Sequence, residues 1–174
     1  MKEDINRKLK RLDDDTEKIF ESIEDLSEDQ LKNQTYGWSL VQVMSHLNEA
    51  EKASLKYMQK KVQAGDKMQN SRMGNKVRMW LTNLGLKSSL KWGAPSYISN
   101  PPEYDLNEIK EQWADTRKAI HSFVEEYPDK WLEKLVYKHP MAGRQNLNGA
   151  VDSFVYHQIH HIHQIKRIRK KMNS

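Results

Sequence analysis

Apolar side chains recur every three or four residues along most of this chain, and this spacing restricts the folds open to it. Near the amino terminus the stripe consists of Ile5, Leu9, Leu12, Thr16, Ile19, Ile23 and Leu26. A stripe with this period lines one face of an α-helix. The segment therefore predicts an amphipathic helix, which must bury its apolar face against other parts of the protein.

A second helix is expected to begin at Ser39, because Ser39 and Gln42 form the S-x-x-Q pattern of a capping box. Beyond it, glycine and proline residues interrupt the periodicity over residues 65–102. A short helix around residues 77–90 is compatible with this stretch. The connection is too long for a tight turn, so we expect a crossover of the kind that often covers a site.

Two further helices are expected, over residues 106–127 and over about 147–171, the latter with Asn146 or Asn148 near its cap. No segment has the length and alternation of a convincing strand. A chain of 174 residues suits one domain. We therefore predict that residues 1–174 form a single all-α domain, a four-helix bundle with a long crossover connection between helices two and three.

The composition excludes several kinds of chemistry. The chain has no cysteine, so it has no disulfide, thiolate metal ligand or cysteine nucleophile, and thiol chemistry would need an external thiol. No stretch approaches the roughly 18 consecutive apolar residues of a membrane span, and the first ten residues are charged throughout. We therefore expect a cytoplasmic protein with no membrane partner.

The formal net charge of +5 raises the alternative of nucleic-acid binding. The densest basic cluster ends the last predicted helix, where cations complement the helix dipole. It consists of Lys166, Arg167, Arg169, Lys170 and Lys171. Because none of the spacing signatures of DNA-binding or RNA-binding modules is present, we expect no nucleic-acid partner.

Four of the seven histidines lie in the last predicted helix, at positions 157, 160, 161 and 163. Since a helix turns by about 100° per residue, His161 falls within the apolar stripe and His157 falls at its margin. His160 and His163 fall on the polar side and should face solvent. His157 and His161 are four residues apart, a spacing by which one helix can offer two imidazoles to one metal ion.

A third ligand must come from another helix, and His46 is the best candidate because it lies on the edge of the second helix's apolar stripe. His121 and His139 are alternatives, and each histidine could instead be an ordinary hydrogen-bonded core residue. Glu51 falls on the buried face of the second helix, where a carboxylate needs a partner. It could orient a ligand histidine, act as a general base, or form a buried salt bridge with a lysine or arginine.

Taken together, these residues resemble the DinB/YfiT-like superfamily of proposed metalloenzymes. The resemblance spans roughly residues 35–170, and its most specific parts are Trp38, the His46-Leu47 pair, the turn from His139-Pro140 to Gly143, and the H-x-x-x-H of the last helix. It implies a four-helix bundle with a long crossover. It also implies that a histidine of helix two joins two from the last helix in binding nickel, zinc or a similar ion, here His46, His157 and His161.

Three neutral imidazoles leave a divalent ion with an open position, the form of a catalytic site. Such an ion can lower the pKa of water for hydrolysis or hold a thiol as thiolate. Since relatives implied by the resemblance include thiol S-transferases, our first hypothesis is transfer of a low-molecular-weight thiol to a small electrophile. The alternatives are metal-dependent hydrolysis of a small molecule, with Glu51 as base, and a non-catalytic metal-binding or scaffold protein.

Three properties stay open at this stage: the metal, the substrate and the oligomeric state. Zinc or nickel fits the predicted ligands best by resemblance, although three histidines accept several divalent ions. Trp113 and Trp131 are candidate contacts for a homodimer. An anionic cosubstrate would meet the basic residues of the long connection, which are Lys67, Arg72, Lys76, Arg78, Lys87 and Lys91.

Overall fold

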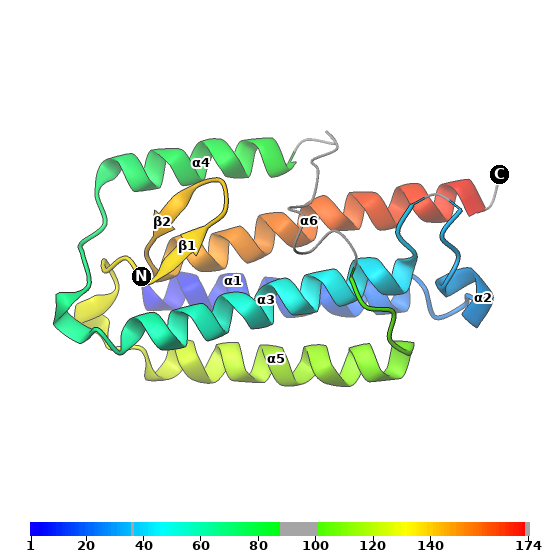
Figure 1. Ribbon diagram of the computed structural model, residues 1–174, viewed down its shortest axis with the longest axis horizontal. Helices are drawn as coiled ribbons and strands as arrows, with labels where there is room; N and C mark the ends of the chain where they lie inside the picture. The colour runs from blue at the N-terminus through cyan, green and yellow to red at the C-terminus, as the bar shows by residue number, and fades with distance from the viewer. Residues whose placement is uncertain (36, 88–100, 173–174) are drawn as a thin grey trace.

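Four long helices form the body of the protein in the computed structural model, which describes residues 1–35, 37–87 and 101–172 (Figure 1). They are α1 (Lys2–Glu21), α3 (Leu40–Val62), α5 (Leu106–Glu126) and α6 (Leu147–Met172). In Figure 1, α3 and α5 run in the same direction, opposite to α1 and α6. The prediction of an all-α four-helix bundle with a long crossover between its second and third long helices is confirmed.

Shorter elements join these helices. The connection after α1 includes the short helix α2 (Glu28–Leu31). The first helix ends at Glu21, five residues before the predicted apolar stripe ends at Leu26. Single 3₁₀ turns lie at Gly65–Lys67 and Asp129–Trp131. The crossover contains α4 (Met73–Lys87), which begins four residues before the expected short helix, and residues 88–90 of that expected helix lie outside the described residues.

Side-chain caps fix where two of the long helices begin. The Gln42 backbone N–H donates to Ser39 Oγ at 3.1 Å, and the Ser39 N–H donates to Gln42 Oε1 at 3.0 Å. This is the predicted capping box. At the start of α6, the Gly149 N–H donates to Asn146 Oδ1 at 3.0 Å, so of the two candidate asparagines it is Asn146 that caps the helix.

A small antiparallel hairpin was not predicted. Its strands are β1 (Tyr137–His139) and β2 (Gly143–Gln145), with His139 opposite Gly143. Gly143 has φ +71°, a left-handed conformation that glycine adopts without strain. Strands of three residues are too short to show alternation, which explains why the sequence pattern gave no sign of them.

The helix α4 packs on the outer side of α6, beside the hairpin (Figure 1). Met79 and Asn83 of α4 are buried. The prediction that His160 faces solvent was wrong, because its side chain is only 7% exposed, whereas His163 is partly exposed. The helical wheel predicted that this side of α6 faces solvent, because the periodicity of α6 gave no sign that another helix covers it.

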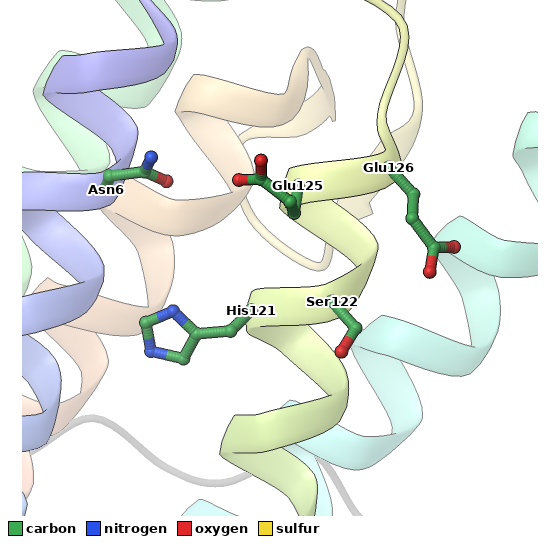
Figure 2. A pocket seen from close by; sticks show the side chains of 5 residues that line it. All are labelled: Asn6, His121, Ser122, Glu125 and Glu126. Carbon is green, nitrogen blue, oxygen red and sulfur yellow. The ribbon is translucent and has the colours of Figure 1, made fainter.

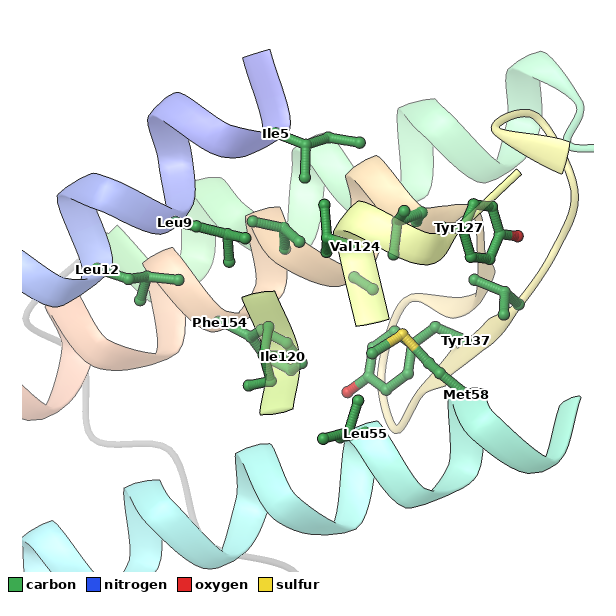
Figure 3. Packing of buried hydrophobic residues seen from close by; sticks show 14 of the residues in the cluster. Ile5, Leu9, Leu12, Leu55, Met58, Ile120, Val124, Tyr127, Tyr137 and Phe154 are labelled. Carbon is green, nitrogen blue, oxygen red and sulfur yellow. The ribbon is translucent and has the colours of Figure 1, made fainter. Parts of the chain in front are cut away.

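The apolar core is divided into two clusters. One contains Ile5, Leu9 and Leu12 of α1 with residues from the second half of α3 and from α5, and Figure 3 shows many of its members. The other contains Ile19 and Ile23 with the first half of α3 and the end of α6. Between them, each long helix contributes polar side chains, so a polar layer crosses the middle of the bundle.

Trp113 belongs to the second cluster and is 1% exposed. The suggestion that it contacts a second copy of the chain was therefore wrong. Its position on the stripe of α5 directs it into the core. Trp131 is partly buried at the other end of the bundle. None of the helices within the described residues is long and apolar enough to cross a membrane.

Candidate metal centre

The structure brings together His46 of α3 and His157 and His161 of α6. His157 Nε2 lies 3.1 Å from His46 Nε2 and 3.1 Å from His161 Nε2. One nitrogen from each of the three rings lies within 4.8 Å of the other two. His46 and His161 are buried, and His157 is partly exposed. The predicted residues thus converge from two helices on one point.

Hydrogen bonding alone does not explain this convergence. An imidazole nitrogen has a single in-plane position, which holds either a proton or a lone pair. His157 Nε2 therefore cannot form a good hydrogen bond with both neighbouring nitrogens. Zinc–nitrogen bonds of about 2.0–2.1 Å would place tetrahedral ligand atoms roughly 3.3 Å apart, close to the distances seen here. The three nitrogens fit a shared divalent ion.

Two neighbouring side chains fix the rings. His161 Nδ1 donates to Gln164 Oε1 at 2.8 Å, which leaves the lone pair on Nε2, the atom that faces the other histidines. The Trp38 ring lies 4.9 Å from the His46 ring and stacks on the His161 ring at 6.3 Å, measured between centroids. These contacts orient the proposed ligands before any ion binds.

The electrostatic setting keeps all three rings neutral near pH 7. Burial lowers the pKa of His46 to about 4, with a smaller effect from His160. Burial lowers the pKa of His161 to about 3 and that of His157 well below its usual value, with further contributions from the neighbouring histidines. Because only the unprotonated imidazole binds a metal, the site is ready for an ion without first losing protons.

These pKa values predict that the metal-free protein loses stability in acid. His46 and His139 both have a pKa of about 4 in the folded chain, against a usual value of 6.5. Between these pH values the unfolded chain binds more protons, so the stabilisation is complete above about pH 6.5 and is lost as the pH falls towards 4. Urea unfolding of chelator-treated protein, followed by circular dichroism, should show a decrease of several kcal/mol.

The variant His46→Asn should have a shallower pH dependence over the same range, because one buried imidazole no longer titrates. Equal stability of the natural chain at pH 7 and pH 4.5 would contradict the interpretation, since it would mean that these rings are protonated at no cost.

His139 holds a different position from the one considered in the sequence. The single lone pair of its Nδ1 is shared between the backbone N–H groups of Met141 and Ala142, which donate to it at 3.1 and 3.0 Å. Nδ1 therefore carries no proton, and the proton of the neutral ring is on Nε2. Burial lowers the pKa of His139 to about 4. The ring is close enough to His157 to influence its pKa, and it is a neutral hydrogen-bond donor of fixed orientation.

His121, the other alternative ligand, lies apart from the three histidines. It is exposed on α5, and its Nε2 lies 2.8 Å from Asp13 Oδ2. Figure 2 shows its ring pointing towards α1 beside an open hollow of about 550 Å³, which is also lined by Asn6, Ser122, Glu125 and Glu126. His121 thus joins two helices through Asp13, and no second imidazole lines the hollow.

Glu51 forms a buried ion pair, one of the three roles left open by the sequence. Arg117 Nε donates to Glu51 Oε2 at 2.6 Å, and Arg117 Nη2 donates to Glu51 Oε1 at 2.8 Å. Trp113 Nε1 also donates to Oε2, at 3.1 Å. The Glu51 side chain is 2% exposed and the Arg117 side chain is 8% exposed. Both carboxylate oxygens are therefore engaged, and no observed contact of Glu51 favours a general base.

The same arginine connects all four long helices. Besides Glu51 of α3, it donates to Asp13 Oδ1 of α1 at 3.1 Å and to Gln158 Oε1 of α6 at 2.8 Å. Gln158 Nε2 in turn donates to Leu12 O and Thr16 Oγ1. Gln158 directly follows His157, so this network fixes α6 next to the three histidines. Sequence reasoning did not single out Arg117, although a cation four residues after Trp113 on an apolar stripe is a usable signal.

Known proteins share the family and the fold of this chain. Residues 9–165 match the sequence model of the DinB superfamily. Among solved structures, the chain is similar to YfiT from Bacillus subtilis, described as "a probable metal-dependent hydrolase with an unusual four-helix bundle topology". The TM-score is 0.59 at 16% identity, over 99% of this chain and 90% of that one. No curated protein matched the sequence. The structural similarity extends to the fold, and the resemblance seen in the sequence is confirmed by the family match.

Proposed function

This chain belongs to the DinB superfamily, and from that premise we propose that it is a metal-dependent hydrolase of a small molecule, with one divalent ion held by His46, His157 and His161. The observation that carries the proposal is the convergence of three Nε2 atoms from two helices. The description of YfiT as "a probable metal-dependent hydrolase" adds support through a shared fold.

The donor set suits catalysis more than a purely structural role. Three neutral imidazoles use three positions of a tetrahedral site, whereas structural zinc sites are closed by four protein ligands. When bound in such a set, a divalent ion supplies Lewis acidity and makes a water molecule more acidic.

The chain's own residues have three tasks in this proposal. Gln164 holds His161 in the tautomer that presents Nε2. Trp38 covers the rings of His46 and His161 and keeps water from that side. His139 has its Nε2 proton available, so it can donate a hydrogen bond to an oxygen of the substrate that gains negative charge during hydrolysis.

Transfer of a thiol, our first hypothesis from the sequence, has no support from the comparisons. That hypothesis rested on the family resemblance and on the absence of cysteine, and the absence of cysteine is equally compatible with hydrolysis. Glu51 is not given the role of base, because Arg117 and Trp113 occupy its oxygens. The identity of the ion stays a prediction of zinc or nickel, since a three-imidazole set binds both.

The test uses untagged protein, stripped with a chelator and reloaded separately with zinc, nickel or cobalt. We expect at least one loaded form to hydrolyse members of a panel of ester and amide substrates, and the His157→Ala variant to have no metal-dependent activity. His163→Ala, on the same helix but outside the cluster, should keep it. A parallel assay combines monochlorobimane with several small thiols. Thiol conjugation without hydrolysis, or failure to bind any ion, would overturn the proposal.

A further inference from the structure

The outer face of α4 carries an exposed apolar stripe. Five large side chains on this one helix are between 48% and 75% exposed, namely Met73, Val77, Trp80, Leu81 and Leu84. At about 100° per residue they fall within an arc of roughly 100°. The buried residues Met79 and Asn83 fall about 150° and 110° from the middle of the stripe, on the side that packs against the bundle. The stripe therefore faces away from the bundle.

Such a stripe is costly to leave in water, and exposed apolar patches of this kind mark surfaces that bind something. Figure 1 shows α4 as a separate outer element above α6 and the hairpin, so the stripe forms a projecting ridge. A projecting ridge inserts into a soft, continuous apolar phase more easily than it fits into a preformed pocket of a partner. Trp80, the most exposed tryptophan among the described residues, belongs to the residue type that concentrates at membrane–water interfaces.

The charged residues of the segment that carries the stripe are all basic. From residue 67 to residue 102 the chain has no acidic residue and has six basic ones. Lys76 and Arg78 are exposed on either side of the stripe, at about 60° before and 140° after Met73 on the helical wheel. Lys76 also pairs with Glu133 at 3.2 Å. An apolar stripe bordered by cations is the pattern of helices that lie in the surface of an anionic bilayer.

A second copy of this chain fits the stripe less well. A two-fold contact places the same surface on both sides, so α4 against α4 would bring the cations of one copy close to those of the other. An anionic partner removes this repulsion. The sequence alone predicted no membrane partner because it has no spanning segment, but a helix that lies in the interface does not need one.

From the exposed stripe and its basic borders, we propose that α4 docks the protein on the surface of anionic lipid membranes. Met73, Trp80 and Leu84 enter the boundary between headgroups and acyl chains, and Lys76 and Arg78 contact lipid phosphates. The bundle and its three histidines stay in water. This inference does not depend on the proposed hydrolase function, because the stripe lies on the outer side of α4.

The experiment is co-sedimentation of the full chain with vesicles, in metal-loaded and metal-free form. We expect binding to vesicles of phosphatidylcholine with phosphatidylglycerol that is at least about tenfold tighter than to phosphatidylcholine alone, and that weakens with added salt. The variant Trp80→Glu/Leu84→Glu should lose it. Met141→Glu changes an apolar side chain of similar exposure on the hairpin, 49%, and should bind as the natural chain does. Circular dichroism checks that each variant is folded.

Equal binding of the double variant and the natural chain would overturn the proposal, as would failure of the natural chain to bind anionic vesicles. A natural chain that is dimeric by light scattering, ignores vesicles and becomes monomeric in the double variant would show that a second copy covers the stripe instead. Neither result would affect the hydrolase proposal, which is tested by metal content and substrate turnover.

Discussion

Replacing His161 by alanine is expected to lower the metal content of the purified protein from about one ion per chain to less than about a tenth of that. The ring supplies one of three nitrogens that converge within 4.8 Å, and the two remaining imidazoles form an incomplete site. The measurement is elemental analysis of untagged protein purified without a nickel column, then dialysed against one equivalent of zinc or nickel.

Two further variants are compared with His161→Ala for their effect on metal binding. Gln164→Ala leaves all three imidazoles in place but removes the acceptor that orients His161, so metal affinity should fall by about 10-fold to 100-fold. His163→Ala removes a histidine of the same helix that lies outside the cluster and should change nothing. If His161→Ala retains a full equivalent of metal, the ion is bound elsewhere and the proposed centre is wrong.

Replacing Arg117 by methionine is expected to destabilise the fold by about 3–5 kcal/mol. The substitution removes every charged donor from Glu51, whose side chain is 2% exposed, and leaves Gln158 and Asp13 without their shared partner. An unpaired buried charge is among the most costly defects that a single substitution can introduce. Urea unfolding followed by circular dichroism measures the loss.

A double substitution separates the ion pair from simple packing. Glu51→Met combined with Arg117→Met removes both charges and fills the space with apolar atoms, so it should cost less than Arg117→Met alone. Lys118→Met, at an exposed neighbouring position on α5, should stay within about 0.5 kcal/mol of the natural chain. A single Arg117→Met variant as stable as the natural chain would show that the polar layer does not hold the helices together.

The two predictions, on metal content and on stability, both involve α6. His157 and His161 contribute to the metal centre on one side of this helix, and Gln158 joins the Arg117 network on another. Loss of Arg117 should therefore also weaken metal binding, because the network fixes the segment of α6 that holds two of the three proposed ligands. Loss of a histidine should leave the ion pair intact.

Much of the fold was predictable because it depends on neighbours in the sequence. The four apolar stripes and the Ser39–Gln42 capping box define helices through interactions within a few residues. The same holds for His157 and His161, whose separation by four residues places them on one face of any helix. The preference for His46 as third candidate came largely from the family resemblance, since its position on a stripe was also compatible with an ordinary core histidine.

Contacts between distant segments were decided by the tertiary structure. His46 and His157 are 111 residues apart, and Arg117 and Glu51 are 66 apart; no local pattern says which side chains will face each other across a bundle. His160 is buried because another part of the chain packs against it, which a helical wheel of α6 alone cannot show. The strands of the hairpin are too short to show an alternating pattern in the sequence. Sequence by itself determined which faces are apolar, because periodicity is local. Only the packing of α3, α4, α5 and α6 determined which groups meet, because that depends on how the faces pair in space.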